Sequence, residues 1–236
     1  AATSGVAATM SEETLLRPYP GAEGDLMVGL SPTALSGLNE GARYLLEYPY
    51  GCLEQKLSRA LPVVTGAELI ETFGLGSLGT LKDETQKVFT QLPNYQHPSG
   101  GFCYWTGYCW KPDPYLTAYA LEASAMALKE GYKADPAVLK RASDWLVQYL
   151  GSEETNWAYP YSRSEDYAAR AYAVYALAMN GRNESAYFNQ LYAKRDQVPY
   201  IAKAYLVKAA KLLGFDAASA KKLSAEIMTQ ARYSPT

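Results

Sequence analysis

Cys52 and Gln55 are the two residues whose types and spacing suggest covalent chemistry. They lie three positions apart in the stretch Tyr48–Gln55, which reads YPYGCLEQ. Pro49 and Gly51 interrupt the chain before Cys52, and the residues after it read as helix. Residues three apart lie on one face of a helical turn, so the Cys52 thiolate can reach the Gln55 carboxamide. Attack with loss of ammonia would leave an internal thioester, which is a stored acyl electrophile.

The residues around Cys52 each have a chemical and a structural interpretation. Tyr48 and Tyr50 can shield a thioester from water, and Gly51 can let the backbone turn closely before the nucleophile. A cysteine at a helix N-terminus also lies at the positive end of the helix dipole, which favours the thiolate. Glu54 either positions the turn through a local hydrogen bond or is a solvated acid of the first turn. The spacing alone is a weak signal, because Cys52 can equally be a small buried apolar residue.

Cys103 and Cys109 are the other two cysteines, and they lie close together in the stretch GGFCYWTGYCW. We interpret three cysteines as one local disulfide and one odd, reactive thiol. The alternative is two buried free thiols within an aromatic cluster. Gly107 can supply the turn that so short a loop needs, and a disulfide would indicate an oxidising compartment such as a periplasm.

Composition favours one globular domain and excludes several classes of function. The 236 residues are 48% hydrophobic and 19% charged, which is typical of a large domain with a real core. A net charge of −2 gives no reason to expect nucleic acid or an anionic membrane as a partner. The single histidine, His97, excludes a multi-histidine metal site, and we expect neither a metal nor a cofactor. No apolar run has the length of a membrane span, so we expect no direct membrane contact from this segment.

Helical patterns punctuated by proline and glycine dominate the chain, and almost no strand pattern is present. Residues 1–30 predict a short non-helical segment, either a linker or the edge of a preceding domain of a longer protein. Residues 31–236 predict one all-α domain. Its expected helices cover about 31–45, 52–73 with a kink or break at Pro62, 81–92, 114–131, 136–151, 165–180, 184–194, 199–213 and 216–231.

Two of these segments resemble each other and predict a repeat of paired helices. Residues 167–181 and 200–214 share the pattern Tyr-x-x-x-Ala-Tyr followed by a closing glycine, and a looser third copy begins at Pro114. Such repeats are typical of an α-solenoid or a closed α/α toroid. Chance similarity between alanine-rich helices is the alternative.

The stretch Gly51–Gln55 resembles the thioester motif of the α2-macroglobulin and complement family, and the longer Tyr48–Gln55 string resembles its bacterial branch. Leu53 stands where animal members usually have glycine, a departure typical of bacterial members. The resemblance covers residues from about 30 to the C-terminus, including the Gly-Gly-Phe-x-x-Trp element at 100–105. It implies an α/α toroid, and because the predicted helices are fewer than the family toroid contains, the toroid can be incomplete here.

The resemblance implies a protease inhibitor that works as a single-turnover covalent trap, and not an enzyme. In this family a target protease cleaves a bait region elsewhere in a large multidomain protein, and the resulting conformational change exposes the thioester. A lysine amine of the protease then attacks the Gln55 acyl carbon and releases the Cys52 thiol. The implied partners are target proteases and other domains of the same large protein. The implied location is the periplasm, within an inner-membrane-anchored lipoprotein.

Some complement-type members pass the acyl group through a histidine to hydroxyls, but His97 does not match the place of that histidine. We therefore predict direct aminolysis, with His97 as a loop hydrogen-bonding residue. The competing hypotheses are a cysteine-nucleophile enzyme with His97 as its base, a helical-repeat binding scaffold, and a carbohydrate-active toroid. The acids of that last alternative would be Asp113, Glu165 and Asp166, although Asp113 reads as a helix cap and the others as first-turn residues.

Overall fold

The structure is a computed structural model that describes Tyr44 and residues 51–72, 77–107, 109–152, 163–214 and 217–229. The description below concerns the compact unit Tyr48–Thr236. Within the described residues the fold is all-α, and the one extended pairing there is an isolated bridge between Gln96 and Phe102. The domain boundary expected near residue 30, the non-helical segment before it and the helix expected at 31–45 lie outside this description, and the boundary stays a prediction.

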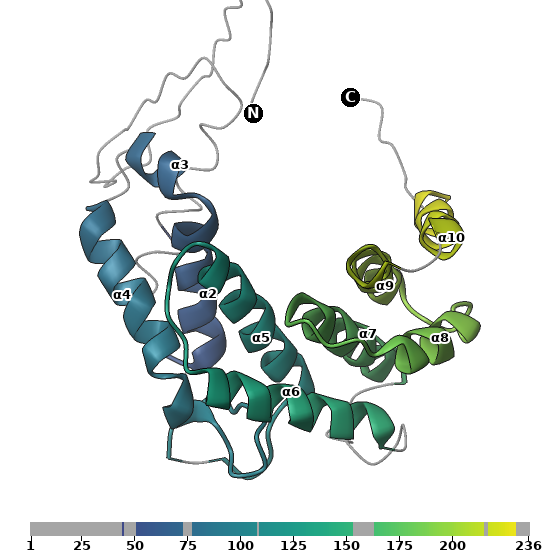
Figure 1. The fold of residues 1–236 in the computed structure, drawn as a ribbon, viewed down its shortest axis with the longest axis horizontal. Helices are drawn as coiled ribbons and strands as arrows, with labels where there is room; N and C mark the ends of the chain where they lie inside the picture. Colours follow the sequence, from purple (N-terminus) through teal and green to yellow (C-terminus); the bar gives the residue numbers. More distant parts are fainter. Residues whose placement is uncertain are drawn as a thin grey trace, which may run out of the picture. The chain divides into compact units, whose positions relative to one another are not determined.

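The described residues form nine α-helices and one 3-10 helix (Figure 1). The helices are α2 (Leu53–Thr65), α3 (Ala67–Thr72), α4 (Leu78–Thr90), the 3-10 helix η1 (Leu92–Tyr95), α5 (Pro114–Lys129), α6 (Pro136–Gly151), α7 (Arg163–Met179), α8 (Ser185–Ala193), α9 (Tyr200–Leu213) and α10 (Ala217–Met228).

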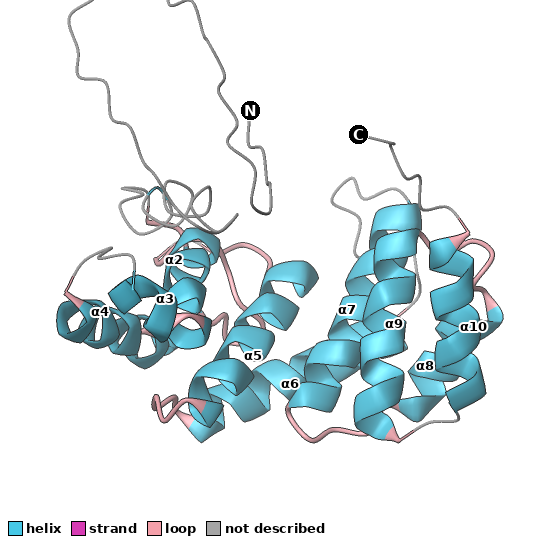
Figure 2. Cartoon of the chain, turned by 90° about the horizontal axis from the view of Figure 1, so that it is seen from above, coloured by secondary structure: helices cyan, strands magenta, loops and turns pink. Residues whose placement is uncertain are grey.

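The helices pack in two rows. In one row α2, α5, α7 and α9 each pack against the next, and Figure 2 shows α7, α9 and α10 side by side. In the other row α4 packs on α2, α6 on α5 and α7, α8 on α7 and α9, and α10 on α9. This arrangement of helical hairpins is that of an α/α toroid, as the resemblance implied.

Proline and glycine signals place several helix ends correctly. The Asp113 carboxylate accepts a hydrogen bond from the Leu116 N–H at 2.8 Å, and Asp135 accepts one from Ala137 at 2.8 Å. In both cases proline occupies the first helical position. An N–H at this position would have no partner within the helix, so proline loses no helical hydrogen bond there. Gly214 ends α9 with a left-handed φ of 65°, a conformation that glycine adopts without a Cβ clash.

The break predicted at Pro62 falls four residues later, at Gly66. Helix α2 continues through Pro62 to Thr65, because proline lacks only its own N–H donor and its carbonyl still accepts a hydrogen bond from the residue four positions later. The Gly66 N–H then donates to the Pro62 carbonyl at 2.8 Å, and α3 begins at Ala67. A Cβ at Gly66 would lie 3.0 Å from that carbonyl oxygen, so the tight approach favours glycine there.

Small residues and tyrosines explain why the central helices approach closely. Ala118, Ala120 and Ala123 on α5 are fully buried. The rings of Tyr172 on α7 and Tyr205 on α9 stack at 4.3 Å between centroids, with an interplanar angle of 15°. These two tyrosines occupy matching positions in the predicted repeat, and their contact is the one that such a repeat would create between neighbouring helices.

The first tyrosine of each repeat copy behaves differently in the two helices. Tyr167 is buried, whereas Tyr200 is 48% exposed. Helix α7 lies between α5 and α9 and also contacts α6 and α8, so that it has neighbours on several sides. The two copies therefore match in sequence, but the helices that surround them differ.

Candidate functional site

Cys52 and Gln55 lie together at the start of α2. Cys52 is the N-cap residue, with the extended backbone typical of that position, and Gln55 lies in the first turn. The Cys52 N–H donates to Gln55 Oε1 at 3.3 Å, and the Cys52 side chain faces the Gln55 N–H in a reciprocal capping box. The thiol is free and buried, with 6% of the residue exposed.

This geometry suits acyl chemistry at the Gln55 carboxamide. The Cys52 N–H contacts the oxygen on which negative charge would develop when a nucleophile adds to the carboxamide carbon. The dipole of the α2 N-terminus adds positive potential at the same place.

Glu54 accepts a hydrogen bond from Ser58 on its own helix, and Ser58 in turn contacts a side chain of α5. Ser58, one turn later, donates to Glu54 Oε1 at 2.9 Å, and Ser58 Oγ shares a second hydrogen bond of 2.9 Å with the Tyr119 hydroxyl on α5. Leu53 and Leu57 on the same helix are fully buried in the core. These contacts agree with the interpretation in which Glu54 helps to position the turn.

Tyr104 lies beside the Cys52 turn, and sequence reasoning gave it no role. Its main-chain carbonyl accepts a hydrogen bond of 2.8 Å from the Leu53 N–H. Burial, and then the charges of Asp113, Glu54 and Cys52, raises the pKa of the Tyr104 phenol to about 12. The phenol therefore stays neutral at physiological pH and keeps its proton for hydrogen bonding.

The other residues predicted to shield or shape the site are only partly described. Tyr48 and Tyr50 lie outside the described residues, and their shielding role stays a prediction. Gly51 lies directly before Cys52, and a Cβ at this position would contact Lys56 Cε at an ordinary 3.8 Å. Among the described residues, no contact therefore requires glycine at position 51.

A disulfide joins Cys103 and Cys109, whose Cα atoms lie 5.8 Å apart. The loop that it closes follows the Gly-Gly-Phe element, and packing against α6 fixes that element. A Cβ at Gly101 would lie 2.6 Å from Pro112 Cβ and 2.7 Å from Trp145 Cδ2, closer than real Cβ atoms come to other heavy atoms. Glycine is therefore required where the loop passes over Trp145.

His97 takes part in the hydrogen bonds of its own loop. Its Nδ1 lies 2.7 Å from Ser99 Oγ and accepts a hydrogen bond from the Ser99 N–H at 3.1 Å. The His97 N–H donates to the Gly101 carbonyl at 2.9 Å. These contacts give His97 the structural role that we expected of it.

The acids of the carbohydrate-active alternative have structural roles. Asp113 caps α5, as described above. Asp166 is buried in an ion pair with Arg170, with 2.6 Å between Oδ2 and Nε, and it also accepts a hydrogen bond from the Tyr149 hydroxyl at 2.8 Å. Glu165 is exposed.

The described residues contain neither a cluster of metal-binding side chains nor a membrane-spanning helix. No three histidine, cysteine, aspartate or glutamate side chains in the described ranges gather as metal ligands. None of the described helices has the length and apolar character needed to cross a membrane.

Comparison with known proteins identifies the family. The model of the A-macroglobulin TED domain, where TED stands for thioester domain, matches residues 22–154, which is more than half of the chain. The chain belongs to this family. The matched range includes Cys52, Gln55 and the disulfide loop. The chain is a thioester domain of the bacterial α2-macroglobulin type.

Bacterial relatives support the same assignment of the thioester domain. An alpha-2-macroglobulin homolog of Yersinia pestis is 27% identical over 182 residues, which are 74% of this chain and 9% of the relative. The alpha-2-macroglobulin of Escherichia coli K12 is 29% identical over 149 residues, 58% of this chain and 9% of the relative. The chain thus spans about a tenth of the length of these relatives.

Solved structures share the fold of this thioester domain. A Salmonella alpha-2-macroglobulin reacted with methylamine superimposes with a TM-score of 0.73 at 25% identity, over 84% of this chain and 13% of the other. Native Escherichia coli alpha-2-macroglobulin, from domain MG7 to the C-terminus, gives the same TM-score at 24% identity over 83% of this chain and 31% of the other. The second likeness shows the fold alone.

Proposed function

We propose that this thioester domain belongs to a protease inhibitor and that Cys52 and Gln55 form its reactive thioester. The observation that carries the proposal is the pairing of the two residues on the first turn of α2, with the Cys52 N–H 3.3 Å from Gln55 Oε1. Burial of the thiol supports it as well, because a thioester lasts only where water has little access.

The proposed chemistry has two steps. First, the Cys52 sulfur adds to the Gln55 carboxamide carbon and ammonia leaves, which forms the thioester. Later, a lysine amine of an attacking protease adds to the same carbon, an amide forms, and the Cys52 thiol leaves with the proton of the amine. The Cys52 N–H stabilises the oxyanion in both steps. Each thioester reacts once, so the protein is an inhibitor and not a catalyst.

The proposal extends to partners and location. The partners are target proteases, captured through lysine, and the other domains of the large protein. The relatives are about ten times longer than the matched region, which supports further domains. We place the protein in the periplasm, within an inner-membrane-anchored lipoprotein. The Cys103–Cys109 disulfide supports an oxidising compartment.

Lysine-directed capture is tested by incubating the full-length protein with trypsin and with trypsin whose lysines have been reductively dimethylated. We expect an adduct that survives denaturing electrophoresis with native trypsin. The adduct should be lost with dimethylated trypsin, because a tertiary amine cannot form an amide. Dimethylated trypsin keeps its hydroxyls and its activity, so the comparison separates amines from hydroxyls as acceptors.

Pretreatment with methylamine is the matched control, since it consumes the thioester before the protease is added. It should abolish the adduct with native trypsin. Equal adduct formation with native and dimethylated trypsin would contradict capture through lysine.

A further inference from the structure

Three hydrogen bonds hold the base of the disulfide loop against two elements, α5 with its N-cap and η1. The Phe102 N–H donates to Thr117 Oγ1 on α5 at 2.8 Å, and the Phe102 carbonyl accepts from the Asp113 N–H at 2.9 Å. The Cys103 N–H donates to the Tyr95 carbonyl at the end of η1 at 2.9 Å. The chain is therefore fixed as far as Cys103, which is itself buried.

Beyond Cys103 the loop is exposed. Residues 104–107 lie on the surface, and Gly107 has a left-handed φ of 78° with open space around it. The disulfide to Cys109 is the covalent restraint that closes this exposed part of the loop. Closing a loop removes many of its alternative conformations, so the disulfide limits where the main chain at Tyr104 can lie.

The Tyr104 carbonyl is the point at which this loop contacts α2. It accepts the 2.8 Å hydrogen bond from the Leu53 N–H, one of the N–H groups for which a helix offers no internal partner. The Leu53 N–H and the Cys52 carbonyl belong to one peptide group. This carbonyl also has a partner, because it accepts a hydrogen bond from the Lys56 N–H at 3.0 Å. The peptide group that joins Cys52 to the helix is thus fixed from both sides.

We propose that the Cys103–Cys109 disulfide is a positioning device for the thioester, acting through the Tyr104 carbonyl on the Cys52–Leu53 peptide unit. This inference rests on the proposed function. With the disulfide closed, the loop holds the first turn of α2 and limits the access of water to the acyl carbon. With the disulfide reduced, the loop loosens, and water attacks the carbon more often, releasing the Cys52 thiol and leaving a carboxylate at position 55.

The test uses the full-length protein after its thioester has formed. A water-soluble phosphine supplies two electrons to the disulfide and becomes the phosphine oxide, and N-ethylmaleimide then blocks the two new thiols. Cys52 is protected inside the thioester during this step. We expect hydrolysis, followed as the later appearance of the Cys52 thiol, to become roughly five- to tenfold faster, the change expected from losing one hydrogen bond.

Variants separate positioning from fold stability. The double variant Cys103→Ser with Cys109→Ser should hydrolyse as fast as the reduced protein, and the phosphine should not change its rate further. The matched control is Trp110→Ala, a neighbour of Cys109 outside the closed ring whose side chain is 87% exposed. It should hydrolyse at the wild-type rate. Far-ultraviolet circular dichroism should show the same helix content in all samples.

The failure of this inference is distinguishable from failure of the proposed function. If the untreated wild-type protein contains no thioester, the proposed function fails before any reduction is attempted. If the thioester is present and its hydrolysis rate is unchanged by reduction and in the double variant, the positioning role is overturned. Loss of helix on reduction would also overturn it, since the disulfide would then hold the fold and not the site.

Discussion

Cys52→Ala and Gln55→Asn are each expected to reduce protease capture and methylamine incorporation to background. The alanine variant has no nucleophile, and the asparagine side chain is one methylene too short to bring its carbonyl carbon to the sulfur. Cys52 and Gln55 are the reacting groups themselves, so the loss of either leaves no route to the acyl intermediate. The measurement is incorporation of radiolabelled methylamine and formation of the trypsin adduct by the full-length variants.

The matched control for the shortened side chain is Gln91→Asn, at the exposed C-cap of α4. It should incorporate methylamine as the wild type does. Thermal unfolding should show that both site variants remain folded, with Cys52→Ala losing about 1 kcal/mol at most through the small cavity left by the sulfur. If either site variant incorporated as much methylamine as the wild type, the acyl group would reside on another residue.

The largest effect on stability is expected from Arg170→Met on α7. The Arg170 guanidinium is buried, pairs with Asp166 at 2.6 Å and donates to the carbonyls of Leu150 at 3.0 Å and Ser152 at 3.3 Å. Methionine would leave the Asp166 carboxylate buried without its cation, which typically costs about 3–5 kcal/mol. Denaturant unfolding monitored by circular dichroism measures this loss.

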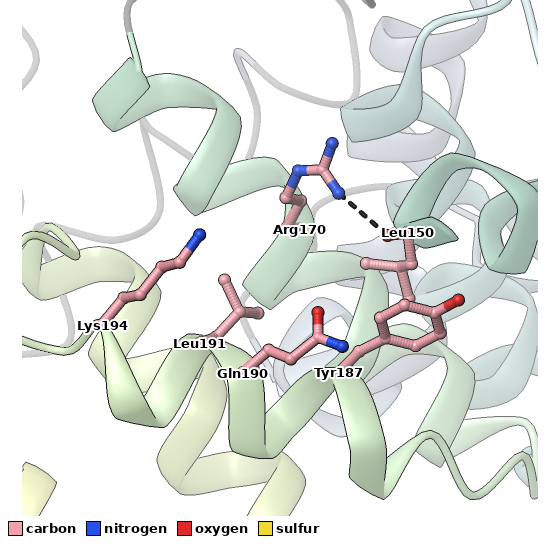
Figure 3. Close-up of a pocket in the computed structure, with 6 residues that line it drawn as sticks. All are labelled: Leu150, Arg170, Tyr187, Gln190, Leu191 and Lys194. Atoms are coloured by element: carbon pink, nitrogen blue, oxygen red, sulfur yellow. Dashed lines mark hydrogen bonds between the residues drawn. The ribbon is translucent and has the colours of Figure 1, made fainter. Parts of the chain in front are cut away.

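The neighbourhood of Arg170 offers little compensation for that loss. Arg170 is one of the residues that line a small cavity of about 20 Å³. Figure 3 shows these residues and the hydrogen bond from the guanidinium to Leu150. The Tyr149 hydroxyl still donates to Asp166 at 2.8 Å in the variant, but it carries no charge to replace that of the guanidinium.

Lys140→Met is the matched control, because Lys140 and Asp144 form an ion pair with the same i,i+4 spacing and the same 2.6 Å distance. The two pairs differ chiefly in burial: the Lys140 side chain is 74% exposed. Asp144 also keeps Arg182 as a partner at 2.8 Å. Solvent screening should limit the loss to about 0.5 kcal/mol. Equal losses in the two variants would show that burial of the Arg170 pair does not determine its contribution.

Local sequence signals predicted those parts of the fold that depend on local physics. Proline at the first position of α5 and α6, with aspartate caps at Asp113 and Asp135, placed the starts of both helices. The spacing of Cys52 and Gln55 indicated that they share one helical turn, which needs only the geometry of that turn. A break was expected at Pro62, but α2 ends at Gly66, because proline removes one donor to the preceding turn and leaves its own carbonyl able to accept.

Features that depend on tertiary contacts were not predictable from the chain. Tyr104 lies about fifty residues after Cys52, and no local pattern links its carbonyl to the Leu53 N–H. Tyr167 and Tyr200 match in the sequence repeat, yet one is buried and the other exposed, because their helices have different neighbours. Asp166 read as a first-turn acid, and only the fold brings the Tyr149 hydroxyl and the carbonyls at the end of α6 around its ion pair.

The mass of the freshly purified, full-length protein tests the central claim most directly. The account predicts a mass lower than that of the sequence by one ammonia, a linked Cys52–Gln55 peptide on digestion, and a Cys52 thiol that stays hidden until methylamine is added. Methylamine should then appear on the Gln55 side chain. A protein with the full sequence mass and a Cys52 thiol that titrates before any amine is added would contradict the thioester.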